Sequence, residues 1–204
     1  MPASSASSSE KPYHHGNLRE AIKDAALDVL AREGASAVSL RDLARSVGVG
    51  HSSIYAHFRD RSDLLAAIAG AGFAELLQQM NAARSRPGDS VANLAASYLH
   101  FARTSPAYYK AMFLPETSRP ENICHVKGAC EQCFQVLIEA LGQNASLSVP
   151  ETRERAVGIW SSLHGLAMLG DDAGPLHNHI APDSELDIAS SIANAVAKGP
   201  WRPG

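Results

Sequence analysis

Hydrogen-bonding side chains are crowded into the short segment GVGHSSIYAHF, residues 48–58. Its hydroxyl, imidazole and phenol groups can donate and accept hydrogen bonds, and the segment has no carboxylate to repel a phosphate. Val49, Ile54 and Phe58 are the residues that fit a buried face. A short helix anchored by these three would hold its polar side outward, where it suits either a nucleic-acid groove or plain solvent.

Cysteine and histidine groups in the second half of the chain could carry metal or redox chemistry. They are Cys130-x-x-Cys133 with Cys124-His125 upstream, and His177-x-His179 with Asp171-Asp172. A zinc site needs four convergent ligands, commonly from two CxxC-like pairs. Only one CxxC is present, in the middle of a predicted helix, and Cys130 falls on the apolar face of that helix. We therefore favour packed thiols and a polar loop, and we expect no metal and no cofactor.

A histidine close to two serines raises the question of nucleophilic catalysis. His164 lies near Ser161 and Ser162, but no nucleophile elbow, phosphate-binding loop or paired-carboxylate motif accompanies them, and we expect no enzyme. Trp160 and His164 are four residues apart and share a helical face. They form either a packed core pair or a direct ligand contact, and the core pair is the commoner arrangement.

Composition limits the class of protein. The 204 residues fit one domain or a small domain joined to a larger one. No uncharged apolar run is long enough to cross a bilayer, and three cysteines suit a reducing cytoplasm. The net charge of −3 argues against indiscriminate nucleic-acid binding, yet residues 39–61 hold four arginines against two aspartates.

The elements that position these residues read as helices throughout. Apolar spacing predicts a first helix from Leu18, which Gly34 ends. Ser39 and Asp42 form a capping box for a second helix, and Gly48 suits a turn with positive φ before a third helix at 51–57. Further helices are predicted from residue 60 and near 89–104, 106–114, 120–141, 151–170 and 184–198.

These elements predict an all-α protein of about nine helices. Two short helices joined by a glycine turn indicate a helix-turn-helix. We expect a disordered arm at residues 1–15, a three-helix DNA-binding domain at 16–62 and a helical bundle at 63–204, with the fourth helix shared by both domains.

The stretch LRDLARSVGVGHSSIYAHFRDRSDLLAAI resembles the DNA-binding segment of TetR-type transcriptional repressors. Arg61 stands where lysine is usual in that family, and a guanidinium also binds phosphate well. The resemblance implies phosphate contacts by Ser39, Arg41, Tyr55, His57 and Arg61, and base readout by His51, Ser52 and Ser53. The segment KPYHHGNLR, residues 11–19, also resembles the lead-in of a subset of these repressors, which implies that Lys11, Tyr13, His14 and His15 lie along the DNA backbone or minor groove. On general grounds, His14 and His15 fit a solvated arm equally well.

The C-terminal half resembles the same family. IWSSLHGLAML is similar to the Trp…His-Gly motif of one C-terminal subclass, and TSPAYYKAMF to its short sixth helix. The resemblance implies a ligand-responsive repressor that binds a palindromic operator in double-stranded DNA as a homodimer and is released by a small apolar ligand. The pocket candidates are Tyr98, Phe101, Tyr109, Phe113, Cys130, Phe134, Trp160 and His164. The dimer candidates are Ile159, Leu166, Ile188, Ile192 and Ala195.

Two other functions compete with this interpretation. A helical enzyme would use His164 with a neighbouring serine. A thiol or metal sensor would use the cysteines on the same DNA-binding scaffold. The pocket candidates are also the positions that any helical core would fill, and most of them fit a core.

Overall fold

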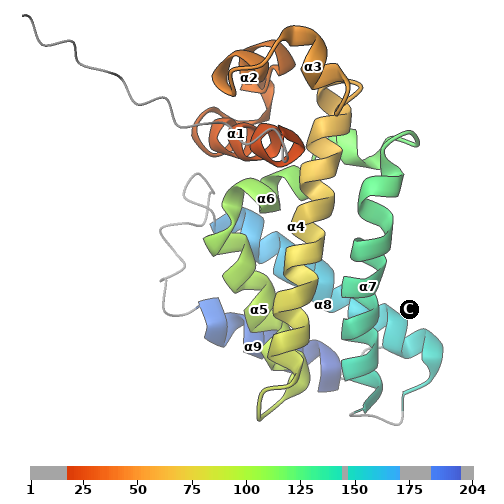
Figure 1. Ribbon diagram of the computed structural model, residues 1–204. Coiled ribbons are helices and arrows are strands. Elements are labelled where there is room, and N and C mark those ends of the chain that lie inside the picture. Colours follow the sequence, from red (N-terminus) through yellow and green to blue (C-terminus); the bar gives the residue numbers. More distant parts are fainter. Residues whose placement is uncertain (1–17, 144–146, 171–184, 199–204) are drawn as a thin grey trace, which may run out of the picture.

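The computed structural model describes residues 18–143, 147–170 and 185–198, and this part of the chain is helical without a strand (Figure 1). The all-α prediction is confirmed. The helices are α1 (Leu18–Glu33), η1 (Ala35–Ala37), α2 (Leu40–Ser46), α3 (His51–Tyr55), α4 (Arg61–Arg84), α5 (Ser90–Thr104), α6 (Pro106–Met112), η2 (Pro115–Ser118), α7 (Ile123–Gln143), α8 (Val149–Gly170) and α9 (Glu185–Lys198). None of these helices combines the length and apolar character that a bilayer crossing requires.

The N-terminal head consists of α1, α2, α3 and the first turns of α4, and Figure 1 shows it at one end of the long helix α4. Its core joins Ile22 of α1, Leu43 of α2 and Ile54 of α3 to Leu64 and Ile68 of α4. These side chains are at most 2% exposed. Burial of such side chains contributes about 1.5–3 kcal/mol each, and this core fixes the orientation of α3.

The C-terminal body is built on the rest of α4, against which α5, α6 and α7 pack, while α8 packs on α5 and α7, and α9 packs on α5 and α8 (Figure 1). Phe73, Leu76 and Met80 of α4 belong to this second core. One helix therefore supplies side chains to both cores and joins the head to the body without a linker. Gly72 allows α6 to approach α4 closely, since a Cβ at that position would lie 3.0 Å from the sulfur of Met112.

The predicted helix starts follow local hydrogen bonding. Ser39 Oγ accepts the amide of Asp42 (3.4 Å), and Asp60 Oδ1 accepts the amide of Asp63 (2.8 Å). The carboxylate of Asp42 accepts from Arg45 (3.0 Å) rather than completing the capping box. Gly48 has a φ of 73°, as predicted for the turn between α2 and α3.

Two local details differ from the prediction. Helix α3 ends at Tyr55 rather than at residue 57, because the amides of His57 and Phe58 both bond to the carbonyl of Ile54 in a closing turn. The short 3-10 segment η2 was not predicted, and its Glu116 contacts the head.

Candidate nucleic-acid interface

The polar side of α3 faces out of the head. Ile54 is fully buried and Phe58 is 1% exposed, so together they anchor the helix. The side chains of His51, Ser52 and Ser53 are exposed on the opposite side. A helix mounted in this way can place hydroxyl and imidazole groups against the base edges of a major groove.

The residues assigned to phosphates surround this face, but they differ in exposure. Arg41 is exposed, and Ser39 and His57 are half-buried. The phenol of Tyr55 is 47% exposed, and its ring packs edge-on against His51 with 5.0 Å between centroids. These four side chains can reach a ligand outside the head without unfolding it.

An open depression of about 490 Å³ lies between α2 and α3. Arg41, Arg45 and His51 line it together with Ala44 and Val49. Arg45 Nη1 forms an ion pair with Asp42 Oδ1 at 3.0 Å, and both side chains are exposed. Two guanidinium groups beside an imidazole make this hollow suitable for a phosphate group. Arg45 was not among the predicted contacts, although its place one turn after Arg41 puts it on the same face.

Arg61 is placed differently from what the resemblance implies. Its Nη1 donates to Glu116 Oε1 (2.7 Å), and its Nη2 donates to the carbonyl of Ala35. Burial opposes ionisation of Glu116, but the hydrogen bond from Arg61, a backbone hydrogen bond and the positive charges of Arg61 and Arg119 together outweigh it and lower the pKa of that carboxyl. In this conformation Arg61 ties the head to η2 and is not directed at a phosphate. The partner is 55 residues away in sequence, so the local motif could not reveal it.

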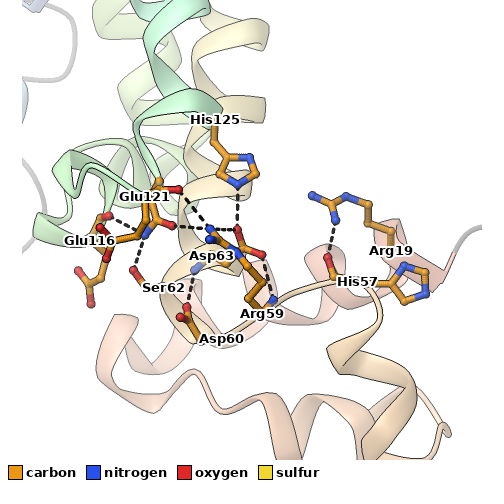
Figure 2. Close-up of polar contacts among 10 residues, drawn as sticks. Arg19, His57, Arg59, Asp60, Ser62, Asp63, Glu116, Glu121 and His125 are labelled. Carbon is orange, nitrogen blue, oxygen red and sulfur yellow. Dashed lines mark hydrogen bonds and ion pairs between the residues drawn. The ribbon is translucent and has the colours of Figure 1, made fainter.

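Arg19 holds the turn after α3 from the other side, and sequence patterns missed it. Its Nη1 donates to the carbonyl of His57 (2.6 Å), and its guanidinium lies 4.4 Å from the centroid of the Phe58 ring. Figure 2 shows this contact beside a larger polar network around Asp63. Helix α1 therefore helps to fix the angle at which α3 leaves the head.

In the body, six of the predicted pocket residues form one aromatic cluster: Tyr98, Tyr109, Phe113, Phe134, Trp160 and His164. Its polar centre is His164 Nδ1, which lies 2.7 Å from Tyr109 Oη and 3.3 Å from Tyr98 Oη. The ring of Phe113 lies 4.2 Å from the imidazole. Phe101 is fully buried in the same core, and Cys130 is half-buried against it.

Burial keeps the groups at this polar centre neutral. It lowers the pKa of His164 and raises the pKa of Tyr98. It also raises the pKa of Tyr109 to about 12, although the hydrogen bond with Tyr98 acts in the opposite direction. Three neutral hydrogen-bonding atoms surrounded by aromatic rings can hold a polar group of an otherwise apolar molecule.

The serines near His164 do not support a nucleophile. Ser162 Oγ donates to the carbonyl of Gly158 (2.8 Å) within its own helix, and Ser161 is exposed. The hydrogen-bond partners of His164 are the two phenols of the aromatic cluster.

The cysteines are free thiols. Burial raises the pKa of Cys133 to about 12 and also raises that of Cys130. Within the described ranges, no group of three or more His, Cys, Asp or Glu side chains could hold a metal ion. Residues 171–179, with the His177-x-His179 pattern, lie outside the described part of the chain, and so do Lys11, Tyr13, His14 and His15.

The predicted dimer residues separate into two groups. Ile159 is fully buried in the core of its own chain, so it cannot meet a partner, and that assignment is corrected. Leu166, Ile188 and Ile192 are half-buried, and Ala195 is exposed. The exposed apolar side chains of α8 that the prediction missed are Val149, Val157, Met168 and Leu169. Apolar periodicity identifies the buried face of α8 but cannot tell a chain's own core from a partner.

Comparison with known families matches both parts of the chain. Residues 22–68 match the bacterial regulatory proteins of the tetR family, and residues 91–189 match the tetracyclin repressor-like C-terminal domain. The solved structure of a protein with unknown function from Rhodococcus sp. RHA1 is 25% identical, with a TM-score of 0.74 over 93% of this chain and 98% of that one. The TetR family regulator PfmR from Thermus thermophilus shares the fold at 16% identity, with a TM-score of 0.66 over 89% of this chain and 99% of PfmR.

A curated relative settles the family. YobS of Bacillus subtilis (strain 168), described as an uncharacterized HTH-type transcriptional regulator, is 31% identical over 156 residues. The aligned region covers 76% of this chain and 79% of YobS. With an outward-facing α3 and a helical body behind it, the chain belongs to the TetR family of bacterial transcriptional regulators, a family of DNA-binding proteins rather than enzymes.

Proposed function

We propose that this regulator is a repressor that binds a palindromic operator as a homodimer in the cytoplasm and leaves it when a small apolar molecule binds the body. The main support for the proposal is the orientation of α3. Ile54 and Phe58 are buried in the head, while His51, Ser52 and Ser53 are exposed. These three residues would read bases. A two-fold dimer would set two such helices about 34–36 Å, or a multiple of that distance, apart.

Phosphate contacts would hold the head in register on the duplex. Arg41, Tyr55, Ser39 and His57 are the candidates, because their side chains border α3 and are exposed or half-buried. Phosphate contacts position a protein without reading sequence, and they make affinity depend on salt. Arg61 would join them only after leaving Glu116, its partner in the free protein.

The homodimer would form through α8 and α9. Leu166, Ile188, Ile192 and Ala195 remain candidates, and exposed apolar side chains of α8 extend the same surface. An Ile192→Arg variant should dissociate the dimer, measured by sedimentation velocity, and should lose affinity for a two-half-site operator more than for a single half-site. An unchanged sedimentation coefficient would contradict this interface.

The aromatic cluster would hold the ligand. Trp160, His164 and Gly165 give the pattern of the Trp…His-Gly subclass, and the phenols of Tyr98 and Tyr109 meet His164 beside them. Because these three groups are neutral in the folded protein, we infer an apolar ligand with one uncharged hydrogen-bonding group. Phe101, Phe113, Cys130 and Phe134 would contribute contact area.

Selection of bound DNA from a random pool tests the DNA-binding role. The full chain should enrich a palindrome, and a competition binding assay should then show a weaker complex for His51→Ala, with relaxed preference at one base pair. One lost base contact costs roughly 1–3 kcal/mol, which is roughly 5- to 150-fold in affinity. The matched control is His100→Ala, another exposed histidine, on α5. Equal binding by both variants would refute the assignment of α3 as the reading helix.

Release by a ligand is tested separately on the operator complex. A library of apolar compounds is screened for dissociation of the selected DNA, and the hits are titrated into Tyr109→Phe and His164→Gln. Both variants should keep operator affinity and lose sensitivity to the hits. Hits that release both variants as well as the wild type would place the ligand elsewhere.

A further inference from the structure

Asp63 gathers three donors at the junction between the head and the body (Figure 2). Its Oδ2 accepts the backbone amide of Arg59 (3.0 Å), and its Oδ1 accepts Arg59 Nη2 (2.9 Å). The same Oδ1 lies 2.9 Å from Nε2 of His125, which comes from the first turn of α7. One carboxylate thus connects α7 to the backbone that follows α3.

The negative charge on Asp63 decides which atom donates in the hydrogen bond between Asp63 and His125. Burial opposes its ionisation, but hydrogen bonds from the side chain and backbone of Arg59 and from His125 outweigh it and lower the pKa to about 2. A carboxylate can only accept hydrogen bonds, so Nε2 of His125 carries the proton and donates it. Asp63 is 6% exposed, so water competes little for this bond.

The backbone of His125 packs closely against α4. Gly70 of α4 allows the two helices to touch, since a Cβ at Gly70 would overlap the carbonyl oxygen of His125. The imidazole therefore follows any movement of α7 relative to α4. Further along α7, Phe134 packs on Trp160 of the aromatic cluster, with ring centroids 6.1 Å apart.

The same junction has other contacts that keep it assembled. Asn122 donates to Ser62 and to the carbonyl of Glu116, and its Oδ1 accepts from Arg59. The two bonds donated by Asn122 do not involve Asp63, whereas Arg59 donates to Asn122 from the same Nη2 that donates to Asp63. Removing the imidazole of His125 therefore loosens the orientation of Asp63 while α7 stays on α4.

We propose that His125 is a positioning residue for operator binding, which holds Asp63 so that the turn between α3 and α4 presents α3 at the angle that DNA requires. The inference rests on the proposed DNA-binding function. His125 contacts no DNA in this scheme. It acts through Asp63 and the amide of Arg59, four residues after the end of α3.

The test compares His125→Leu with His125→Gln in the full-length chain. Gln keeps an N–H donor, whereas Leu fills space without one. On the operator selected by the wild type, His125→Leu should bind about tenfold more weakly, within the usual range for coupling between sites, and His125→Gln should recover most of the affinity. His100→Leu is the control for a histidine lost from an exposed position.

Amide hydrogen exchange supplies a second readout in the free protein. The Arg59 amide should exchange faster in His125→Leu than in the wild type and return towards wild-type protection in His125→Gln. If His125→Leu fails to fold, His125→Asn, whose amide is too short to reach Asp63, takes its place. A merely structural contact would lower the melting temperature of both variants without the rescue of affinity by Gln.

The outcomes separate this inference from the function on which it rests. If the wild type selects an operator and His125→Leu binds it equally well, the positioning role is overturned and the DNA-binding function stands. Equal weakening by Leu and Gln also overturns it. If the wild type selects no DNA, the proposed function fails and the positioning role fails with it.

Discussion

Replacement of Asp63 by asparagine should lower stability in a pH-dependent way. The pKa of Asp63 is about 2 in the folded chain and 3.8 for an unperturbed aspartate. A depressed pKa stabilises the folded state above the unfolded value, and the stabilisation is lost as pH falls through the folded value. A difference of nearly two pKa units corresponds to at most about 2.4 kcal/mol at neutral pH and about half of that at pH 3.

Urea denaturation followed by circular dichroism measures this effect. Wild type and Asp63→Asn are unfolded at one protein concentration, because dimerisation would make stability depend on concentration. The difference in unfolding free energy should be about 2 kcal/mol near pH 7 and should shrink as pH is lowered to about 3. Asp28→Asn, at an exposed position on α1, serves as the control.

Two results would refute the reasoning. A stability difference that stays constant from neutral pH to about pH 3 would mean that the ionised carboxylate is not the source of the stabilisation. A difference no larger than that of Asp28→Asn would mean that the donors from Arg59 and His125 contribute nothing measurable.

Three further predictions concern the stability of the body. Gly70→Ala should destabilise the fold by about 1–3 kcal/mol, because the new Cβ would overlap a backbone carbonyl of α7. Gly128→Ala should stabilise the fold by about 0.5–1 kcal/mol, because open space surrounds Gly128. Opposite signs in thermal unfolding are expected, and equal signs would contradict the close helix contact. Arg155→Met should lower the free energy of unfolding by about 2 kcal/mol, since the buried guanidinium donates to two carbonyls in the last turn of α9. Arg153→Met, at an exposed position, should change the free energy of unfolding little in the same denaturation assay. Because burial lowers the pKa of His164 from 6.5, wild-type stability should fall as pH drops below that value, and a decline of equal size in His164→Gln would exclude the imidazole as its cause.

Local features of the head could be predicted because they depend on neighbours in sequence. Ser39 caps α2 through the amide three residues ahead, and Gly48 takes the positive φ that its turn needs. The spacing of Ile54 and Phe58 is enough to state which side of α3 is buried. The aromatic cluster also followed from helical spacing, since a helix face that packs inward brings its rings to one place.

Partners distant in sequence could not be predicted. The motif around Arg61 suggests a free cation, yet Glu116 of an unpredicted 3-10 segment lies beside it. The sequence places His125 beside the cysteines, whereas its partner Asp63 lies 62 residues earlier. Ile159 was assigned to a dimer surface because periodicity alone does not distinguish the neighbours of an apolar face. In each case the answer depends on packing between distant elements: η2 and α7 against α4, and α8 against α5, α7 and α9.

Ala111 of α6 is fully buried in the core of the head, not of the body. The core of the head therefore includes a residue from α6, which follows α5 in the sequence. A hybrid regulator that grafts residues 18–68 onto another effector module would leave a hole where this methyl group sits. A hybrid regulator designed to respond to a different effector should therefore keep α6 together with the head, with the junction to the new module placed after α6.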